Sequence, residues 1–436
     1  MGSDARTKPT TLKSSNKKYY WRIGEPPPPI DKHSETKHAI IEEYVRRYIL
    51  TMMSRATIPL LQLSLIDGFC GGGNYTRESG GLADGSPIRL MQAVRQARAE
   101  LNLGRRIPRE VSVDYHFNDL LPDTTDYLRY WLNGKFEEGC LDIADRQRHE
   151  ITTGDFLAEL PRMLQKIKSR RMGEHAIFVL DQYDYDDIPL PQIANVLNHL
   201  EGAEVILTFN IGSLITYLSD RAANRKPLAR IGLDQYIPWE RIGHIKSSER
   251  QSWRRVIQRH IANGIRAESG AKFMTLFFVK PHGVNTWDYW LIHLSNRYRA
   301  HDVMKTLHWE HATEFGHELE PGVFVLGYDA NQDSDYTGQS TLVFGESSED
   351  LCVDGVREYF GDRIFSGNGP VLVGDLLREC VGNSMGAESH LLTSMGQLHR
   401  SKNIVVSTKD GRIRRPSMHY NNDDIVEANR QIILIK

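Results

Sequence analysis

The chain has 436 residues, of which 40% are hydrophobic and 25% are charged, and its formal net charge is -2. These values are typical of a globular protein of two or three domains, and they exclude a chain whose overall charge would draw it to nucleic acid or membranes. No apolar run is long enough to span a bilayer, and no secretory signal opens the sequence. The four cysteines are far apart and form no Cys-x-x-Cys pair, which excludes an ordinary zinc ribbon and favours a reducing, cytoplasmic setting.

The first segment of the chain is polar and then proline-rich. We therefore expect residues 1–30 to form a disordered or extended arm. Apolar residues at spacings of three and four then predict an amphipathic helix over about 33–49, capped by Ser34 or Thr36.

Short apolar runs alternate with amphipathic helices over the next 250 residues or so, which predicts a parallel sheet covered on both faces. The predicted parallel strands are 63–66, 111–117, 151–155, 175–180 and 204–210. A helix should start near Ser86, which we expect at the N-cap, with Pro87 in the first turn. Two later runs, 272–279 and 289–294, predict an antiparallel hairpin, which is the ending typical of the methyltransferase fold.

The first predicted strand ends in Asp67 and runs directly into a glycine-dense turn. Glycines at such a turn let the backbone bend sharply and approach a ligand closely. The pattern Asp-x-Phe-x-Gly-x-Gly resembles the first motif of S-adenosylmethionine (SAM) methyltransferases, whereas a dinucleotide fingerprint would need a further glycine at 74–76. A plain tight turn is the alternative. Cys70 in this turn could be a nucleophile, but we expect a small residue packed beside a ligand.

A SAM site at this turn would give its residues distinct roles. Gly71 and Gly73 would lie against the methionine part of the ligand, and Asp67 would face the ammonium group. Lys37 and His38 could line the pocket, although helix-capping or core contacts explain them equally well. The candidate cofactor-binding residues are Asp67, Phe69, Gly71, Gly73, Asp119, Asp155 and Phe156.

Polar residues end the next two predicted strands. Asp119 would bind the ribose hydroxyls, because a carboxylate can accept two hydrogen bonds from a diol, and Asn118 is the rival for this role. Asp155 would reach the adenine amino group, with Phe156 against the ring.

An acidic loop follows the fourth strand. Asp181 and Tyr183 stand where amino-methyltransferases place a polar group that accepts a hydrogen bond from the target amine and an aromatic ring that stacks on a base, so we assign them as catalytic candidates. Together with Asp184, Asp186 and Asp187, Asp181 could instead hold Mg²⁺ or Mn²⁺, or the loop could simply be solvated. No firm metal site is predicted.

From about residue 346 the pattern changes to short helices around 371–377 and 391–398, then two strand-like runs, 404–409 and 412–415, on either side of Asp410-Gly411. This order resembles a winged helix with a hairpin turn. The outward face of the second helix should carry His390, Gln397 and His399, and the module could bind nucleic acid or dock on a protein. The candidate phosphate contacts are Arg400, Lys402, Lys409, Arg412, Arg414 and Arg415.

Several motifs together resemble the three-Cys-motif partner (TcmP) proteins. They are His33-Ser-x-x-Lys37-His38, Asp67-Gly-Phe69-x-Gly71-x-Gly73-x-Tyr75, Gly85-Ser86-Pro87, Asp181-x-Tyr183 and Met304-Lys305. The resemblance implies a methyltransferase-like domain at 31–318, a linker at 319–345 and a winged helix at 346–436. It also implies a radical-SAM-like three-Cys-motif partner and a mobile-element or phage-related setting. Where the family usually has Asp-Pro-Tyr-Gly, this chain has Asp181-Gln-Tyr-Asp184, and Cys and Gly replace Ala and Pro at positions 70 and 72.

Three functions follow as hypotheses. The leading one is a SAM-binding, methyltransferase-like protein that acts on or binds DNA or RNA. The second is a non-catalytic scaffold that uses the methyltransferase fold to bind its partner. The third is a metal-dependent nuclease that uses the acidic loop at 181–187.

Overall fold

The computed structural model describes residues 19–170, 174–243, 245, 253–279, 289–310, 346–366, 369–384, 386–417 and 419–429. The first part of the predicted N-terminal arm, the loop of the predicted hairpin at 280–288 and the predicted linker at 319–345 lie outside these residues. The chain divides into two compact units, Met1–Gln165 and Lys166–Lys436, and each is described by itself.

The first unit is built on three parallel strands in the order β5-β4-β1. Their bounds are Leu60–Asp67 for β1, Glu110–Asp119 for β4 and His149–Thr153 for β5. The central part of β4 is buried on both faces, as is the second half of β1, so the polar residues Ser64, Ser112 and His116 of these strands are buried together with the apolar ones. A small antiparallel pair, β2 (Asn74–Thr76) and β3 (Leu82–Asp84), follows the glycine turn and was not predicted.

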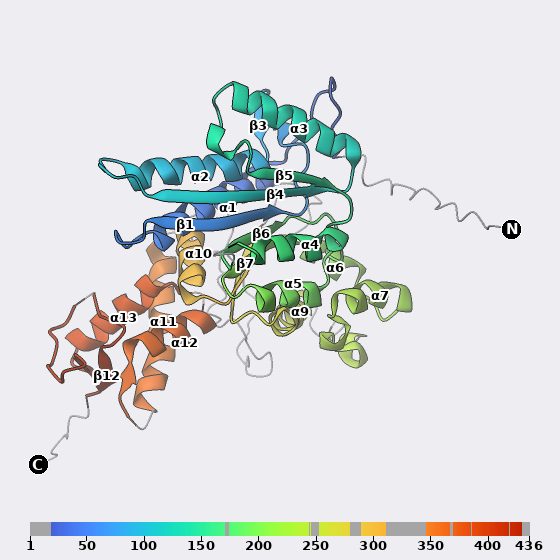
Figure 1. Cartoon of the computed structure of the whole chain (residues 1–436). Helices are drawn as coiled ribbons and strands as arrows, with labels where there is room; N and C mark the ends of the chain where they lie inside the picture. The colour runs from blue at the N-terminus through green and yellow to red at the C-terminus, as the bar shows by residue number, and fades with distance from the viewer. Residues whose placement is uncertain are drawn as a thin grey trace, which may run out of the picture. The chain divides into compact units, whose positions relative to one another are not determined.

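Helices cover this part of the sheet, with α2 packed along β1 and β4 (Figure 1). Their bounds are Lys32–Met52 for α1, Ser86–Asn102 for α2, Pro122–Glu137 for α3 and Phe156–Lys168 for α4, with a 3₁₀ turn η2 at Ile143–Asp145. The predicted caps are wrong at two ends. The N-cap of α1 is Asp31, not Ser34 or Thr36, and the N-cap of α2 is Gly85, one residue before Ser86.

The α/β part of the second unit has its described strands in the order β6-β7-β9-β8. They are β6 (Ala176–Leu180), β7 (Ala203–Phe209), β8 (Phe273–Val279) and β9 (Tyr289–Ser295). β6 and β7 are parallel, whereas β9 is antiparallel to both of its neighbours, which confirms the predicted antiparallel ending. The helical elements between and after these strands are α5 (Leu190–His199), α6 (Ile211–Tyr217), α7 (Ala222–Ile231), η3 (Asp234–Tyr236), η4 (Trp239–Arg241), α9 (Trp253–Ser269) and α10 (Tyr298–Glu310).

These two series of strands define the fold class. Parallel strands alternate with helices in both units, and the series in the second unit ends in the antiparallel pair β8–β9. This is the SAM-methyltransferase-like α/β class that the sequence predicts.

The C-terminal part of the second unit has three helices and a small antiparallel sheet in the order β10-β12-β11. The elements are α11 (Glu346–Phe365), β10 (Val371–Leu372), α12 (Val373–Asn383), α13 (Glu388–Arg400), β11 (Ile404–Ser407) and β12 (Ile425–Ala428). The pairing predicted for residues 412–415 is wrong in part. A turn does form at Asp410-Gly411, and the predicted arms are joined by the bridge between Ser407 and Ile413 and by backbone hydrogen bonds from Thr408 N–H to the Arg412 carbonyl (2.9 Å) and from Arg414 N–H to the Val406 carbonyl (2.8 Å). The strand that pairs with β11 along its length is β12, however, and not residues 412–415.

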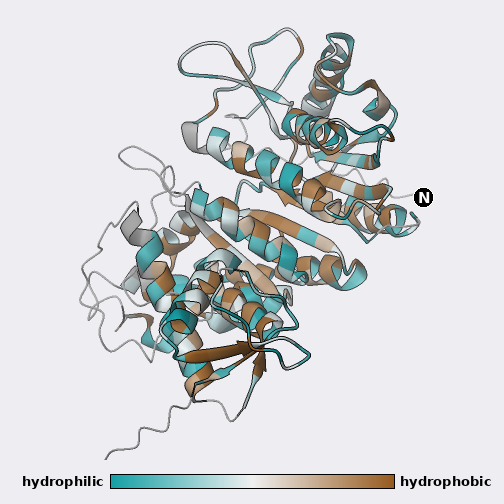
Figure 2. Cartoon of the chain, turned by 90° about the vertical axis from the view of Figure 1, so that its left-hand side faces the viewer, coloured by the Kyte–Doolittle hydropathy of each residue, from teal (hydrophilic) through white to brown (hydrophobic). Residues whose placement is uncertain are grey.

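Hydrophobic side chains are concentrated in the interior of these elements. In Figure 2 the strands are mostly brown, whereas the helices alternate between brown and teal faces. In the C-terminal helices the buried positions include Phe360, Leu376, Leu391 and Met395, which share one core. Among the described helices, none is both long and apolar enough to cross a membrane.

Helix α10 connects the hairpin to this C-terminal core, since it contacts β8, β9 and α12. Lys305 on α10 is buried, and its Nζ donates to the carbonyl oxygens of Val381 and Ser384 at the end of α12. Asp302 Oδ1 accepts the Glu388 backbone N–H at the start of α13, at 2.9 Å. A single helix therefore caps both ends of the turn between α12 and α13.

Candidate functional site

The glycine turn lies at the carboxyl end of β1 in the first unit. Gly71 and Gly73 have φ angles of 60° and 85°, in the left-handed region that favours glycine. The buried Asp67 accepts the Phe69 backbone N–H at 3.3 Å, and the Cys70 N–H donates to the Asn118 carbonyl at 2.9 Å. The turn is thus tied both to its own strand and to the end of β4.

Asp119 anchors the same turn from the end of β4. Its Oδ2 accepts the Gly71 N–H at 3.2 Å and its Oδ1 accepts the Leu121 N–H at 3.0 Å. Burial raises the pKa of Asp119 above its usual range, although the backbone N–H donors oppose the shift. Each carboxylate oxygen can accept a further hydrogen bond, so the group can hold the turn and still bind a ligand hydroxyl.

Asn118, the rival to Asp119, has a different role. Its Nδ2 donates to the carbonyls of Gly68 and Gly154, and its Oδ1 accepts the Thr152 hydroxyl at 2.8 Å. The side chain is buried and joins the ends of the three strands. It is therefore already committed within the fold, and Asp119 is the better candidate for a ligand contact.

Phe69 and Phe156 lie against each other, with ring centroids 6.1 Å apart. The first follows β1 and the second follows β5, so their contact crosses the end of the intervening strand β4. Asp155 is exposed, and its Oδ1 accepts the Leu157 N–H at 2.9 Å at the start of α4. The structure therefore gathers the predicted residues of the first unit at one edge of its strands.

Trp21, which the sequence did not single out, is the most prominent addition to this region. Its ring lies on the glycine turn, and its Nε1 donates to the Asn74 carbonyl at 2.7 Å. The nearby Tyr75 meets Trp21 edge-on at 5.3 Å and His38 at 6.0 Å between ring centroids. Lys37 and His38 are both buried on α1, so neither is a surface group of that helix.

Cys70 is buried in the turn. Burial raises the pKa of its thiol well above the usual range, and the charges of Asp67 and Asp119 act in the same direction. A protonated, inaccessible thiol is a poor nucleophile, which supports the packing interpretation.

The predicted catalytic pair lies in the second unit, directly after β6. Asp181 is half-buried, and Tyr183 has 47% of its surface exposed. Between them Gln182 is buried, and its Oε1 accepts the Ile188 N–H at 2.9 Å. The buried Gln182 side chain thus joins the two ends of the loop.

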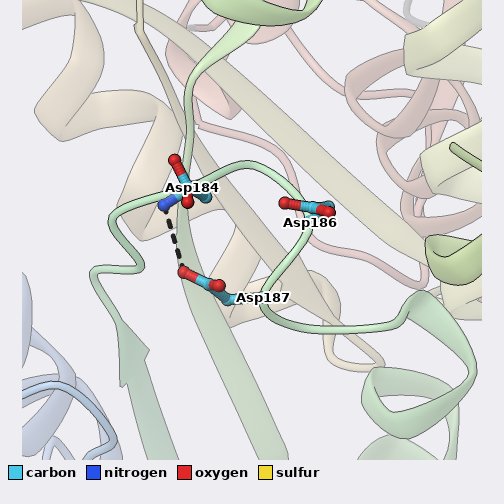
Figure 3. A group of neighbouring side chains, drawn as sticks. All are labelled: Asp184, Asp186 and Asp187. Atoms are coloured by element: carbon cyan, nitrogen blue, oxygen red, sulfur yellow. Dashed lines mark hydrogen bonds between the residues drawn. The ribbon is translucent and has the colours of Figure 1, made fainter. Parts of the chain in front are cut away.

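Three carboxylates of this loop form a cluster (Figure 3). Asp184, Asp186 and Asp187 can each place one oxygen within 4.8 Å of the others, a spacing that could hold a divalent cation. Two interactions within the protein also account for the close approach of these carboxylates without a bound cation. Asp187 Oδ2 accepts the Asp184 N–H at 3.0 Å, and Arg230 pairs with Asp186 at 2.6 Å.

The predicted phosphate contacts of the C-terminal module differ in their surroundings. Arg414 Nε lies 2.8 Å from Oδ2 of the buried Asp424, so this guanidinium is already engaged in an ion pair. The exposed predicted cations are Arg400, Lys402, Lys409, Arg412 and Arg415. Ile413, 75% exposed, stands among the last of these.

The prediction that α13 presents histidines outward is wrong. His390 is buried, and its ring lies 4.7 Å from that of Trp309 on α10. His399 is also buried, and its Nδ1 lies 3.0 Å from the hydroxyl of Tyr420. Burial lowers the pKa of His390 to about 4, so this side chain is neutral near pH 7.

Comparisons with known proteins give distant structural similarity alone. No family model matches the chain, and no curated protein matches its sequence. Among solved structures, a Legionella pneumophila protein (LPL1258) shows 11% identity and a TM-score of 0.35, covering 65% of this chain and 93% of its own. The SAM-bound magnesium protoporphyrin IX methyltransferase of Synechocystis PCC 6803 shows 10% identity and a TM-score of 0.23, covering 61% and 85%. PKMT2 from Rickettsia typhi shows 9% identity and a TM-score of 0.25, covering 77% and 68%. The fold class follows from the strand order.

Proposed function

We propose that the chain is a SAM-dependent, methyltransferase-like protein that acts on or binds nucleic acid. The observation that carries the proposal is the arrangement at the end of β1, where a left-handed glycine turn is held by Asp67 and Asp119 beside the pair Phe69–Phe156. Small residues in a tight turn, carboxylates and an aromatic pair suit a ligand that combines an amino acid, a ribose and a purine.

Each of these groups would hold one part of SAM. The backbone of Gly71 and Gly73 would lie along the methionine part, Asp67 would face the ammonium group, and Asp119 would accept hydrogen bonds from the ribose hydroxyls. Phe69 and Phe156, with Asp155, would hold the adenine. When bound, SAM supplies a methyl group on a positively charged sulfur.

In this proposal Asp181 and Tyr183 position the acceptor. The carboxylate would accept a hydrogen bond from a target amine, and the exposed ring of Tyr183 would stack on a base. The C-terminal module is proposed to be a winged helix whose exposed cations contact phosphate. A radical-SAM-like three-Cys-motif protein as partner, a mobile-element or phage-related setting and a cytoplasmic location belong to the same proposal.

Calorimetric titration of the full chain with SAM tests the cofactor. We expect binding that weakens about 10-fold or more in Asp119→Ala, because a hydrogen bond to a charged group contributes about 1.5–3 kcal/mol. Asp114→Ala is the matched control on the same strand, since Asp114 pairs with Arg148. No binding at millimolar SAM would end the enzyme proposal.

Transfer of a radiolabelled methyl group from SAM to DNA, RNA or protein tests the reaction. Asp181→Ala should reduce transfer about 100-fold while leaving SAM affinity unchanged, because positioned acid–base groups contribute about 10²–10⁴-fold. Equal transfer by wild type and variant would remove Asp181 from the mechanism.

The closed loop at Gln182 favours a second candidate, a scaffold without catalysis. It predicts co-purification with the three-Cys-motif protein and no methyl incorporation into any substrate.

The carboxylate cluster in Figure 3 is the basis of the third candidate, a metal-dependent nuclease. Magnesium-dependent nicking of DNA or RNA that disappears in Asp186→Asn would support it, and metal-independent nicking would exclude it.

A further inference from the structure

The ring of Trp21 and the glycine turn fit each other closely. A Cβ atom built on Gly71 would lie 2.8 Å from Cη2 of Trp21, and one built on Gly72 would overlap Cδ1 and Cγ of the same ring. Only 4% of the surface of Trp21 is exposed. Any side chain at these two positions would therefore displace the indole.

Gly72 is the position where this fit is tightest. Because it has no side chain, the Trp21 ring can lie directly against the backbone there. The same contact means that a ligand on this side of Gly71 and Gly72 and the Trp21 ring cannot occupy the turn at once.

The segment that carries Trp21 is held at its C-terminal end, residues 27–30, mainly by backbone hydrogen bonds. Thr76 N–H donates to the Pro28 carbonyl at 2.9 Å, and Ile30 N–H donates to the Thr76 carbonyl at 3.0 Å. The Thr76 hydroxyl donates to the Pro27 carbonyl at 2.9 Å. Residues 27–30 therefore remain attached to β2 through three hydrogen bonds.

The N-terminal end of the same segment, residues 20–22, is the front of the segment, and its side chains make the contacts that hold it. The Tyr20 hydroxyl bonds to Asp123 on α3, and Arg22 Nη2 lies 3.4 Å from the same carboxylate. The side chains of Arg22 and Asp123 are exposed and Tyr20 is half-buried, and exposed ion pairs contribute little. Trp21 itself is held by the hydrogen bond from its Nε1 to the Asn74 carbonyl and by the edge-on contact of its ring with Tyr75.

We infer that residues 19–30 form a strap over the glycine turn and that Trp21 is its gate: the ring covers the place where the methionine part of SAM would lie. This inference rests on the proposed function. Residues 27–30 stay fixed, and residues 19–26 move away from the turn when the Trp21 ring leaves it. Because SAM binds only the open turn, the measured affinity is reduced by the fraction of molecules in which the turn is covered.

Titration calorimetry with SAM on the full chain tests the gate with four variants. Trp21→Ala removes the ring, and Asp123→Ala releases the front of the strap without touching it. Trp21→Phe keeps an aromatic cover, and Tyr130→Ala is the control, an exposed aromatic on α3. Thermal melting of each variant confirms that it folds.

We expect Trp21→Ala to bind SAM at least about 10-fold more tightly than wild type, and Asp123→Ala to bind it severalfold more tightly. The SAM affinity of Trp21→Phe should be nearer to that of wild type, and the affinity of Tyr130→Ala should equal that of wild type. If wild type binds and Trp21→Ala binds equally or more weakly, the gate is refuted, because the ring is then neutral or a wall of the site, while the proposed function stands. If Trp21→Ala does not fold, unchanged affinity in Asp123→Ala refutes the gate. If neither wild type nor any variant binds, the proposed function fails and the gate fails with it.

Discussion

The buried amine of Lys305 gives the most quantitative prediction. Its Nζ donates to the carbonyls of Val381 and Ser384, and Gly386 O lies 3.5 Å away. Lys305→Met would fill a similar volume with no donor. The Val381 carbonyl would keep His301 Nε2 at 3.2 Å, but the other two would lose this donor.

The cost of that substitution can be worked from these contacts. Two buried acceptors without donors cost about 1–3 kcal/mol each. Part of this cost is offset because methionine does not have the desolvation cost of a buried amine. We therefore expect a net loss of about 2–4 kcal/mol of unfolding free energy. Urea unfolding followed by circular dichroism measures it, with Lys272→Met as the control because Lys272 is exposed in the same unit. A loss within about 0.5 kcal/mol of that control would refute the reasoning.

The same residue predicts a pH dependence. Burial lowers the pKa of Lys305 from its usual 10.5 to about 7. Between these values the unfolded chain binds more protons than the folded chain, so the contribution of Lys305 to stability rises with pH, by up to about 1.4 kcal/mol per unit. The difference in unfolding free energy between wild type and Lys305→Met should therefore grow as the pH is raised from 7 towards 10. A constant difference across this window would contradict the assignment.

Three further predictions concern the cations at 409–415, the ion pair of Arg414 and the glycine turn. If the C-terminal module binds nucleic acid as proposed, replacing the exposed Lys409, Arg412 and Arg415 with alanine should weaken DNA or RNA binding. The slope of log affinity against log salt should fall by about 3, roughly 0.9 for each phosphate contact. Arg414→Ala should instead lower thermal stability, because it leaves the buried Asp424 without its cation, and an unchanged melting temperature would speak against this. Cys70 should resist iodoacetamide in the folded protein while the less buried Cys140 reacts, as mass spectrometry can show; rapid labelling of Cys70 would contradict its burial.

Part of the sheet could be predicted because β6 and β7 are buried on both faces. β6 is wholly apolar and wholly buried, so its sequence alone marks a central strand. The antiparallel ending was also readable, because two apolar runs flank a short polar loop. The ends of elements were less accessible, as the caps of α1 and α2 show, because capping depends on backbone geometry that several neighbouring residues could satisfy.

The features that the sequence did not predict depend on contacts between residues far apart in the chain. The Asp410-Gly411 turn is a local signal and does form, yet the strand that pairs with β11 along its length is β12, which begins at Ile425 and not at residue 412 as predicted. The burial of His390 depends on Trp309, a residue of another helix. Trp21 lies 50 residues before the turn it covers, in a proline-rich segment without periodicity, so no local pattern could have connected the two.

A crystal structure of the full chain grown with millimolar SAM tests the central claim most directly. The account predicts density for the nucleoside beside Asp119 and the Phe69–Phe156 pair, with the amino-acid part along Gly71–Gly73 and the Trp21 indole displaced. SAM bound elsewhere, or an empty turn with the indole still seated on it, would contradict the account.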